Sequence, residues 1–244
     1  TGQGLADPFD EPCNGCGRRG GRMHRRCAPT CRISALWVGA KMRPFTVLTG
    51  DCVLMPSENI DTDQLIPARF MNRTRSSGYG GYLFYDLRYD AHGAQIPEFE
   101  LNKTSGSEVI LVGGQNFGCG SSREAAVYAL LDYGFRAIVA PSFGDIFRNN
   151  ASKNGLLTVP LTDQDHTEFV EQLSQSGSTN VKIDLAMQTL GFTSGANFSF
   201  EIDPAIKRKM LQGIDDLAET LQYKAMIENF ETKYLQSKPW LFPK

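Results

Sequence analysis

The sequence predicts a mixed α/β fold, and three features of the chain lead to that prediction. A short apolar run at residues 109–112 is followed by a glycine-rich turn and then by helix-forming residues at 125–131. Short apolar runs and amphipathic stretches alternate from residue 136 to residue 175. The tail from Asp215 onward is largely helical in composition. Short strands that alternate with longer amphipathic segments are typical of sheets covered by helices.

Composition excludes several classes of protein. The 244 residues include 41% hydrophobic and 21% charged residues, which is ordinary for a globular protein with a sizeable core in one domain or two. A net charge of −2 provides no basic surface for nucleic acid. No run approaches the roughly 18 apolar residues of a membrane helix, and no signal peptide is apparent. We therefore expect neither nucleic acid nor a membrane as a partner.

Residues 1–41 differ from the rest of the chain. They hold seven Lys/Arg and three Asp/Glu, a net charge of 7 − 3 = +4. Cys-x-x-Cys at 13–16 and Cys-x-x-x-Cys at 27–31, with His24 between them, are compatible with a zinc site. However, the span between them has no strand pattern that would set a tetrahedral geometry. We expect residues 1–41 to be a disordered or non-native extension and residues 42–244 to form the domain.

Only two cysteines follow Met42, namely Cys52 and Cys119. Two are too few for a disulfide scaffold, so a reducing cytoplasm is the expected compartment. Cys119 lies between two glycines, and we interpret it as a small residue that fills a tight turn.

The first part of the domain predicts strands and loops. Residues 45–56 predict a strand, a turn at Gly50-Asp51 and a second strand. The acids Asp61 and Asp63 follow, and they either serve a metal or acid–base site or cap a short helical turn. Residues 72–106 are rich in Gly, Tyr, Arg and Ser. This long segment either closes over a substrate or another subunit, or carries tyrosines that anchor a surface loop.

The second part predicts alternating elements. Strands are expected at 136–140, 156–159, 181–185, 188–192 and 197–202. A helix over 142–153 should be capped by Ser142 and end near Gly155. An amphipathic helix over 162–175 should place His166 on its solvent-facing side. Pro204 should begin a further helix.

Residues 116–124 carry the strongest functional signal, Asn-Phe-Gly-Cys-Gly-Ser-Ser-Arg-Glu. The start of a helix leaves backbone N–H groups unpaired, so a turn at this position can bind an anion. Arg123 can hold a carboxylate through two parallel hydrogen bonds. The alternative is that Ser121 or Ser122 only caps the helix, with Glu124 close to capping-box position.

This nonapeptide closely resembles the family of 3-isopropylmalate dehydratase small subunits, as does Asp-Tyr-Gly-Phe-Arg-Ala-Ile-Val-Ala-Pro-Ser-Phe-Gly-Asp-Ile-Phe at 132–147. That family is similar to the swivelling domain of aconitase. The resemblance extends from about Met42 to the C-terminus, with one departure at Ala125, where the family often has histidine. It implies a single swivelling domain with a layered β/β/α core, a mixed sheet and a helical C-terminal addition.

The resemblance also implies an activity. It implies one half of a hydro-lyase that isomerises 2-isopropylmalate and 3-isopropylmalate in leucine biosynthesis, by removing water and adding it back. The enzyme would be active only as a heterodimer with a large subunit. A four-iron four-sulfur cluster would be held by that large subunit, and no metal or cofactor by this chain, whose family core has only Cys52 and Cys119. The substrate would be a small dicarboxylate or hydroxy acid.

Seven residues receive roles from this resemblance. Ser121 would take and return the carbon-bound proton, Arg123 would grip a substrate carboxylate and Asp63 would support them. The residues expected to bind the substrate are Ser122, which would stabilise the serine oxygen or a carboxylate, Arg69, which would contact a carboxylate, and Phe70 and Met71, which would form an apolar wall.

Two alternatives stay open at this point. The chain could be the small subunit of a sister hydro-lyase that acts on homoaconitate, citraconate or a methylated malate, because these enzymes share the Ser-Ser-Arg turn. It could also be a non-catalytic domain that binds an anion in the glycine-rich turn.

Overall fold

The computed structural model describes residues 42–75, 78–121, 123–176, 179–192, 195–238 and 240. All of them belong to one compact unit, which spans Lys41–Lys244. The expected extension at residues 1–41 and its zinc alternative lie outside the described residues.

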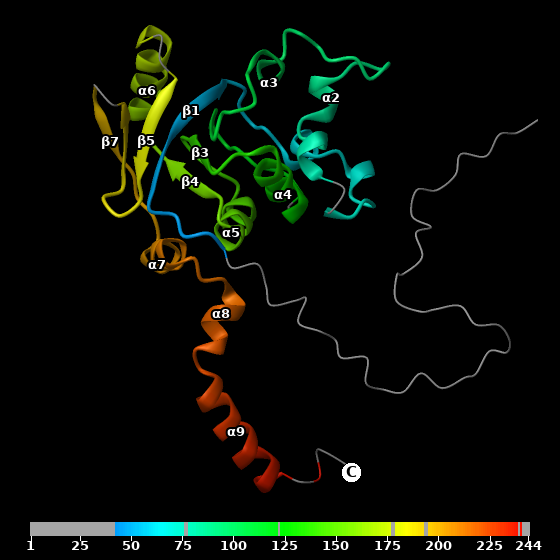
Figure 1. The fold of residues 1–244 in the computed structure, drawn as a ribbon, viewed down its shortest axis with the longest axis vertical. Helices are drawn as coiled ribbons and strands as arrows, with labels where there is room; N and C mark the ends of the chain where they lie inside the picture. Colours follow the sequence, from blue (N-terminus) through cyan, green and yellow to red (C-terminus); the bar gives the residue numbers. More distant parts are fainter. Residues whose placement is uncertain are drawn as a thin grey trace, which may run out of the picture. The chain divides into compact units, whose positions relative to one another are not determined.

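Seven strands form one mixed sheet in the order β4-β3-β2-β1-β5-β6-β7 (Figure 1). Strands β1 to β4 pair in parallel, whereas β1–β5, β5–β6 and β6–β7 pair antiparallel. The strands are β1 (Val47–Met55), β2 (Ile110–Gly113), β3 (Ala137–Ala140), β4 (Leu157–Pro160), β5 (Asn180–Asp184), β6 (Thr189–Phe192) and β7 (Asn197–Ser199). The predicted mixed α/β class is confirmed, with the C-terminal helices that the prediction included.

Helices cover the sheet and continue beyond it. The longer ones in the described residues are α4 (Glu124–Tyr133), α5 (Asp145–Asn154), α6 (Asp163–Ser176), α7 (Pro204–Gln212), α8 (Asp216–Leu221) and α9 (Lys224–Ser237). Single turns are α1 (Thr62–Leu65), η1 (Ala68–Phe70), η3 (Tyr79–Tyr82), α2 (Tyr85–Arg88) and α3 (Glu100–Lys103). Among these helices, none combines the length and the apolar character that crossing a membrane requires.

The parallel half of the sheet is buried on both faces. Leu111 of β2 packs in one apolar cluster together with residues of α4 and α5, such as Leu130 and Phe147. Its neighbours Ile110 and Val112 pack in a second cluster on the other face. Strands buried on both faces are continuous apolar runs in sequence, which is why residues 109–112 predicted a strand so clearly.

The predicted turn at Gly50-Asp51 is wrong, because β1 runs straight through it. Gly50 pairs with Val181, and Asp51 pairs with Asn180, on β5. A Cβ atom at Gly50 would lie 2.4 Å from Cγ2 of Val109. The glycine therefore allows a close approach of a neighbouring segment and does not mark a turn.

The predicted cap of α5 is also wrong. The helix begins at Asp145, with Gly144 as its N-cap and no side-chain cap. The Ser142 hydroxyl instead accepts a hydrogen bond of 2.8 Å from the backbone N–H of Asn116. The predicted end is confirmed, because Gly155 adopts φ +80° at the C-cap.

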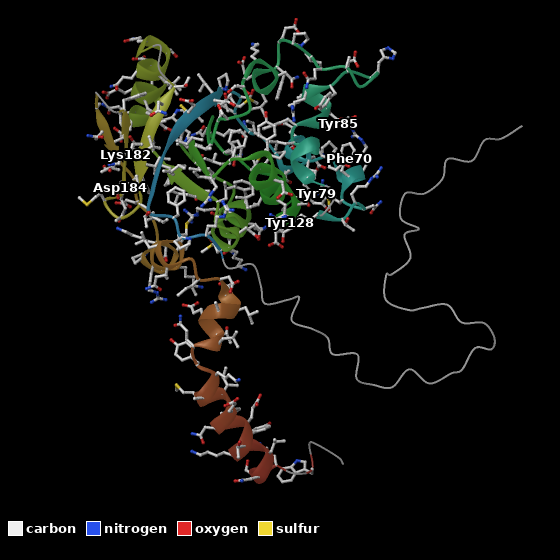
Figure 2. The ribbon with its side chains drawn as sticks, viewed as in Figure 1. Phe70, Tyr79, Tyr85, Tyr128, Lys182 and Asp184 are labelled. Atoms are coloured by element: carbon white, nitrogen blue, oxygen red, sulfur yellow. The ribbon has the colours of Figure 1, made fainter. Side chains whose placement is uncertain are left out.

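Aromatic side chains fix the segment between β1 and β2 against α4 (Figure 2). Phe70 stacks on Tyr82 with ring centroids 4.3 Å apart, and Tyr79 lies 6.5 Å from Tyr128 of α4. Asp132 of α4 forms a 3.0 Å ion pair with Arg75. These contacts support the interpretation of the tyrosines as anchors.

The sequence predicted that His166 lies on the solvent-facing side of α6, and this prediction is wrong. The ring is half-buried, and Nε2 lies 2.9 Å from the carbonyl oxygen of Gly113 at the end of β2. Burial lowers the pKa of His166 below its usual value, although the contact with Gly113 and the charge of Asp163 act in the opposite direction. The folded state therefore favours the neutral ring.

This histidine predicts a pH dependence of stability. Because the unfolded chain takes up the proton near pH 6.5 and the folded chain only at lower pH, the contribution of His166 is complete above pH 6.5. It should decrease as the pH falls below that value toward the folded pKa. Urea unfolding between pH 7.5 and 5.5 measures the slope, and His166→Gln is the control. Equal slopes in the parent and in His166→Gln would contradict the assignment.

Candidate active site

The predicted site lies where three neighbouring parallel strands end. The loop at 57–62 follows β1, the turn at 114–121 follows β2 and residues 141–144 follow β3. Because β1, β2 and β3 are adjacent and parallel, their carboxyl ends meet at one edge of the sheet. Ligands bind at such edges in many α/β proteins. The fold thus brings together three segments that are separated in sequence, the first of them by more than 50 residues from the second.

Backbone hydrogen bonds hold the central turn from two sides. On one side, Phe117 donates to the carbonyl of Ser142 (3.0 Å) and accepts from Gly144 (2.9 Å). On the other side, the N–H of Gly118 donates to Ile60 (2.7 Å). The N–H of Thr62 donates to the carbonyl of Cys119 (3.1 Å) on that same side. The turn is therefore fixed before any ligand binds.

Close packing explains the first glycine of the turn. Gly118 adopts φ +73°, and a Cβ atom there would lie 2.2 Å from Cγ of Phe147 in α5. The neighbour that comes closest to this glycine is therefore an aromatic ring. Gly120 also has a positive φ, +85°, but its Cβ would lie 3.4 Å from Cβ of Asp61, an ordinary contact.

Ser121 is exposed and precedes the helix. Helix α4 begins at Glu124, and Arg123 is its N-cap residue without a side-chain cap. Glu124 is the first residue of the helix and not the third, so it does not complete a capping box. Its carboxylate accepts a hydrogen bond of 2.8 Å from Asn154 of α5. The alternative in which Ser121 caps α4 is therefore wrong. Ser122 lies outside the described residues.

Arg123 and Asp63 form an ion pair beside the turn, through Nη1 and Oδ1. The arginine side chain is 18% exposed and the aspartate 53%. A guanidinium carries five N–H donors, so Arg123 can hold Asp63 through Nη1 and offer other donors to a second carboxylate. Asp63 thus lies against Arg123, and its supporting role stays a prediction.

Thr62 also fixes the turn, and sequence reasoning missed it. Its side chain is buried, and its hydroxyl donates to the carbonyl oxygen of Ser121. The nearest sequence signal is its position directly before Asp63. Thr62 is a positioning residue, because it acts on the backbone of Ser121.

The other predicted substrate-binding residues lie on and next to η1. Arg69 forms an ion pair with Asp86, with 2.8 Å between Nη1 and Oδ2, and its guanidinium lies 4.6 Å from the ring centroid of Phe70. Met71 is exposed. These contacts tie Arg69 and Phe70 to the 79–89 segment. A substrate carboxylate that reached Arg69 would compete with Asp86.

The described cysteines do not fit an iron–sulfur cluster. The Cys52 thiol is buried on β1, donates to the carbonyl of Thr179 (3.1 Å), and has a pKa raised by burial to about 12. A cluster needs several thiolates, and Cys119 is the other cysteine in the part of the chain that the structure describes. Within that part, no three His, Cys, Asp or Glu side chains are grouped to hold a metal ion.

The described residues around Ser121 do not enclose it in a cavity. A surface cavity of about 720 Å³ lies where β4 ends and α6 begins, and its described lining comes from Arg148, residues 160–162, Asp165, residues 187–188 and residues 199–201. That lining contains none of the predicted site residues. Ser121 and Asp63 are instead exposed on the surface, so a second body must cover them if water is to be excluded.

The two glycines allow a matched test of the turn. Gly120→Ala should cost about 1 kcal/mol, because a side chain is introduced at positive φ where space is available. Gly118→Ala should cost about 3 kcal/mol or more, because the overlap with Phe147 is added. Urea unfolding measures both. Equal costs would show that the Phe147 contact does not constrain the turn.

Comparison with known proteins agrees with this geometry. A family model described as the aconitase C-terminal domain matches residues 42–164. A second model, described as the C-terminal domain of the 3-isopropylmalate dehydratase small subunit, matches residues 219–244. The chain also resembles a crystal structure of 3-isopropylmalate dehydratase from Methanocaldococcus jannaschii, with a TM-score of 0.54 and 24% identity, over 76% of this chain and 99% of that one. This last likeness supports the fold.

Two bacterial relatives are more similar in sequence. The 3-isopropylmalate dehydratase small subunit of Roseiflexus sp. (strain RS-1) is 48% identical over 192 residues, which are 78% of this chain and 94% of the relative. That of Dinoroseobacter shibae is 43% identical over 201 residues, which are 82% of this chain and 100% of the relative. The chain therefore belongs to the family of 3-isopropylmalate dehydratase small subunits and carries their aconitase C-terminal domain.

Proposed function

We propose that this chain supplies one half of the active site of a hydro-lyase that interconverts 2-isopropylmalate and 3-isopropylmalate in leucine biosynthesis. The large subunit supplies the other half in a heterodimer. Membership of the small-subunit family supports the reaction class. The observation that carries the proposal is the fixed turn, which presents an exposed Ser121 close in sequence to Arg123 at the carboxyl ends of the parallel strands.

Arg123 is proposed to bind a substrate carboxylate. The planar guanidinium matches a carboxylate with two parallel N–H···O bonds. Asp63 holds the arginine from one side, so part of the side-chain entropy is lost before the substrate arrives. Arg69, Phe70 and Met71 remain candidates for contact with the rest of the substrate.

Ser121 is proposed to take the proton from the substrate carbon and to return it. A serine hydroxyl is a weak base at neutral pH, so the alkoxide needs preorganised donors in a site closed to water. The backbone of the turn and Ser122 are the candidates for those donors in this chain. Ser121 is exposed to solvent in the described part of this chain, so we assign the exclusion of water to the large subunit.

A four-iron four-sulfur cluster in the large subunit is proposed to act as the Lewis acid for the leaving hydroxyl. The described cysteines of this chain do not fit such a cluster, since Cys52 is buried as a thiol. This chain then contributes the base and part of the carboxylate clamp.

Two substitutions test the roles of Ser121 and Arg123. Ser121→Ala should lower kcat by about 10²–10⁴-fold with KM nearly unchanged, because the hydroxyl acts in proton transfer and adds little to ground-state binding. Arg123→Lys keeps the charge but loses the paired geometry, so KM should rise as kcat falls. Steady-state kinetics with the large subunit measure both.

The controls for these variants are thermal melts and the unmixed chain. The variants should melt within a few degrees of the parent, and the chain alone should show no turnover. A Ser121→Ala enzyme that turns over near the parent rate would leave the mechanism without its base. Turnover by the chain alone would contradict a divided site.

A substrate panel tests the identity of the hydroxy acid. The mixed subunits should act on 2- and 3-isopropylmalate with a higher kcat/KM than on homoaconitate, citraconate or a methylated malate. A branched alkyl group needs an apolar wall, and each methylene is worth only about 1–3 kcal/mol of discrimination. A preference for another panel member would identify a sister hydro-lyase. Anion binding without turnover on any member would indicate a non-catalytic domain.

A further inference from the structure

Helix α9 has an apolar face that is open to solvent. Phe230 follows Met226 by four residues and Ile227 by three, which places the three side chains on one face of a helix. Met226 is 70% exposed and Phe230 is 65% exposed. Ala225 and Thr232 are seven residues apart, and at 100° per residue they fall on the opposite side of the helix. None of the fourteen residues of α9 is buried.

A helix of this kind needs a partner to be stable. It has fourteen residues and no side-chain cap at its N-terminus. Isolated helices of about 12–15 residues are marginal in water, and most helical stability in proteins comes from packing of an apolar face. Within the described residues, this apolar face is left to the solvent. The geometry therefore indicates an interaction surface.

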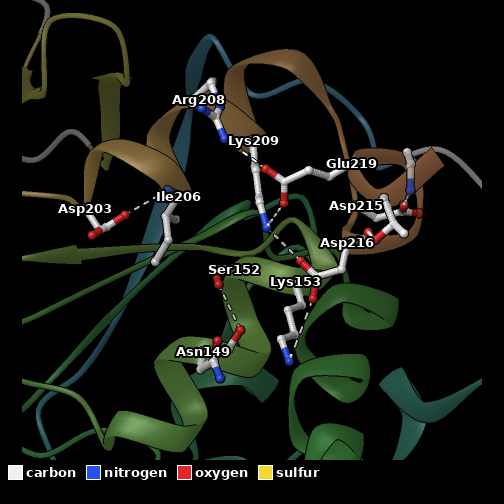
Figure 3. Close-up of polar contacts among 12 residues, drawn as sticks. Asn149, Ser152, Lys153, Asp203, Ile206, Arg208, Lys209, Asp215, Asp216 and Glu219 are labelled. Carbon is white, nitrogen blue, oxygen red and sulfur yellow. Dashed lines mark hydrogen bonds and ion pairs between the residues drawn. The ribbon is translucent and has the colours of Figure 1, made fainter. Parts of the chain in front are cut away.

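Ion pairs hold the preceding helix on the body of the domain. Lys209 of α7 lies between the carboxylates of Asp216 (2.8 Å) and Glu219 (2.6 Å) of α8 (Figure 3). Arg208 also pairs with Glu219 at 2.8 Å. Helix α9 begins at Lys224, three residues after α8 ends. The ion-paired helix α8 therefore connects α9 to the body of the domain.

The family matches point to one occupant. The core of this chain matches a domain that, by its description, forms the C-terminal part of aconitase, so it is joined there to the rest of the enzyme by the peptide chain. The segment that includes α9 matches a different family model, one described for the small subunit. A tethered domain has an effective concentration in the millimolar range without any dedicated contact. A separate subunit needs a non-covalent anchor to reach the same occupancy.

We propose that the apolar face of α9 is the anchor that docks this chain onto its large subunit, in an apolar groove of that partner. The inference rests on the proposed function, because it takes the large subunit as the occupant. It goes beyond that function by assigning assembly to a segment that contains none of the proposed catalytic residues.

Two double variants of the full chain test the anchor. Ile227→Glu with Phe230→Glu places two charges on the apolar face. Ala225→Glu with Thr232→Glu places the same charges on the opposite face, and Glu is a good helix former at all four positions. Sedimentation velocity titrations with the cluster-loaded large subunit measure the Kd of each. The first variant should raise Kd at least about tenfold, while the second should stay within about twofold of the parent.

Two further readouts separate docking from catalysis and from misfolding. At a saturating concentration of the large subunit, the apolar-face variant should recover turnover close to the parent value. Amide hydrogen exchange over residues 224–237 should slow in the parent when the large subunit is added. Phe230→Ala, which adds no charge, should weaken binding by a smaller factor. Thermal melts check that the core of each variant is intact.

The outcomes are distinguishable. An apolar-face variant that binds as tightly as the parent overturns the anchor. So does a parent chain that dimerises through α9 while the variant keeps its affinity for the large subunit, because the occupant is then a second copy. A parent chain that binds no large subunit at all overturns the proposed function and, with it, this inference.

Discussion

Backbone hydrogen bonds that reach the 117–121 turn from both neighbouring loops are the constraint on which the site depends. The donors and acceptors come from residues 60–62 after β1 and from residues 142–144 after β3. Neither loop is close to the turn in sequence. The turn therefore has its shape only when β1, β2 and β3 lie side by side in parallel order. The geometry of the site thus depends on the folded sheet.

This arrangement reduces the entropic cost of catalysis. Ser121 and Arg123 would otherwise lie on a glycine-containing loop with many accessible conformations. Packing of Phe147 against Gly118 and the hydrogen bond from Thr62 remove most of that freedom in the absence of a ligand. Catalytic groups that are already in place need less binding energy from the substrate to become ordered. The glycines thus serve a rigid turn, although glycine alone would predict a flexible one.

Sequence reasoning succeeded where the signal is local. Doubly buried strands such as residues 110–113 are continuous apolar runs, and Gly155 marks a helix end by its own backbone conformation. It failed at Gly50 and Ser142, where the deciding partner is distant: Val109 in one case and Asn116 in the other. Turn-forming residues are ambiguous in sequence, because a small residue suits both a turn and a close approach of two segments.

In the candidate site, too, the local features were predictable from the sequence and the contacts between distant residues were not. The motif around Ser121 was recognisable, because a strand, a glycine-rich turn and a helix follow one another directly in the sequence. The ion pair between Arg123 and Asp63 joins residues 60 positions apart, and the hydrogen bond from Thr62 spans 59. Spacing along the chain contains no information on such contacts. The roles of Asp63 and Thr62 therefore depend on the tertiary structure.

The exposure of Ser121 places two different demands on a partner. If Ser121 transfers a proton as proposed, water must be excluded during that step, yet substrate and product must enter and leave. The cover over Ser121 then has to open in every cycle. If those covering contacts were the sole contacts between the subunits, each opening would let the small subunit diffuse away. A separate anchor keeps closure unimolecular, with the partner at a high effective concentration. An aconitase-like domain connected by the peptide chain has this property already, and a domain made as a separate subunit has to obtain it from an additional surface.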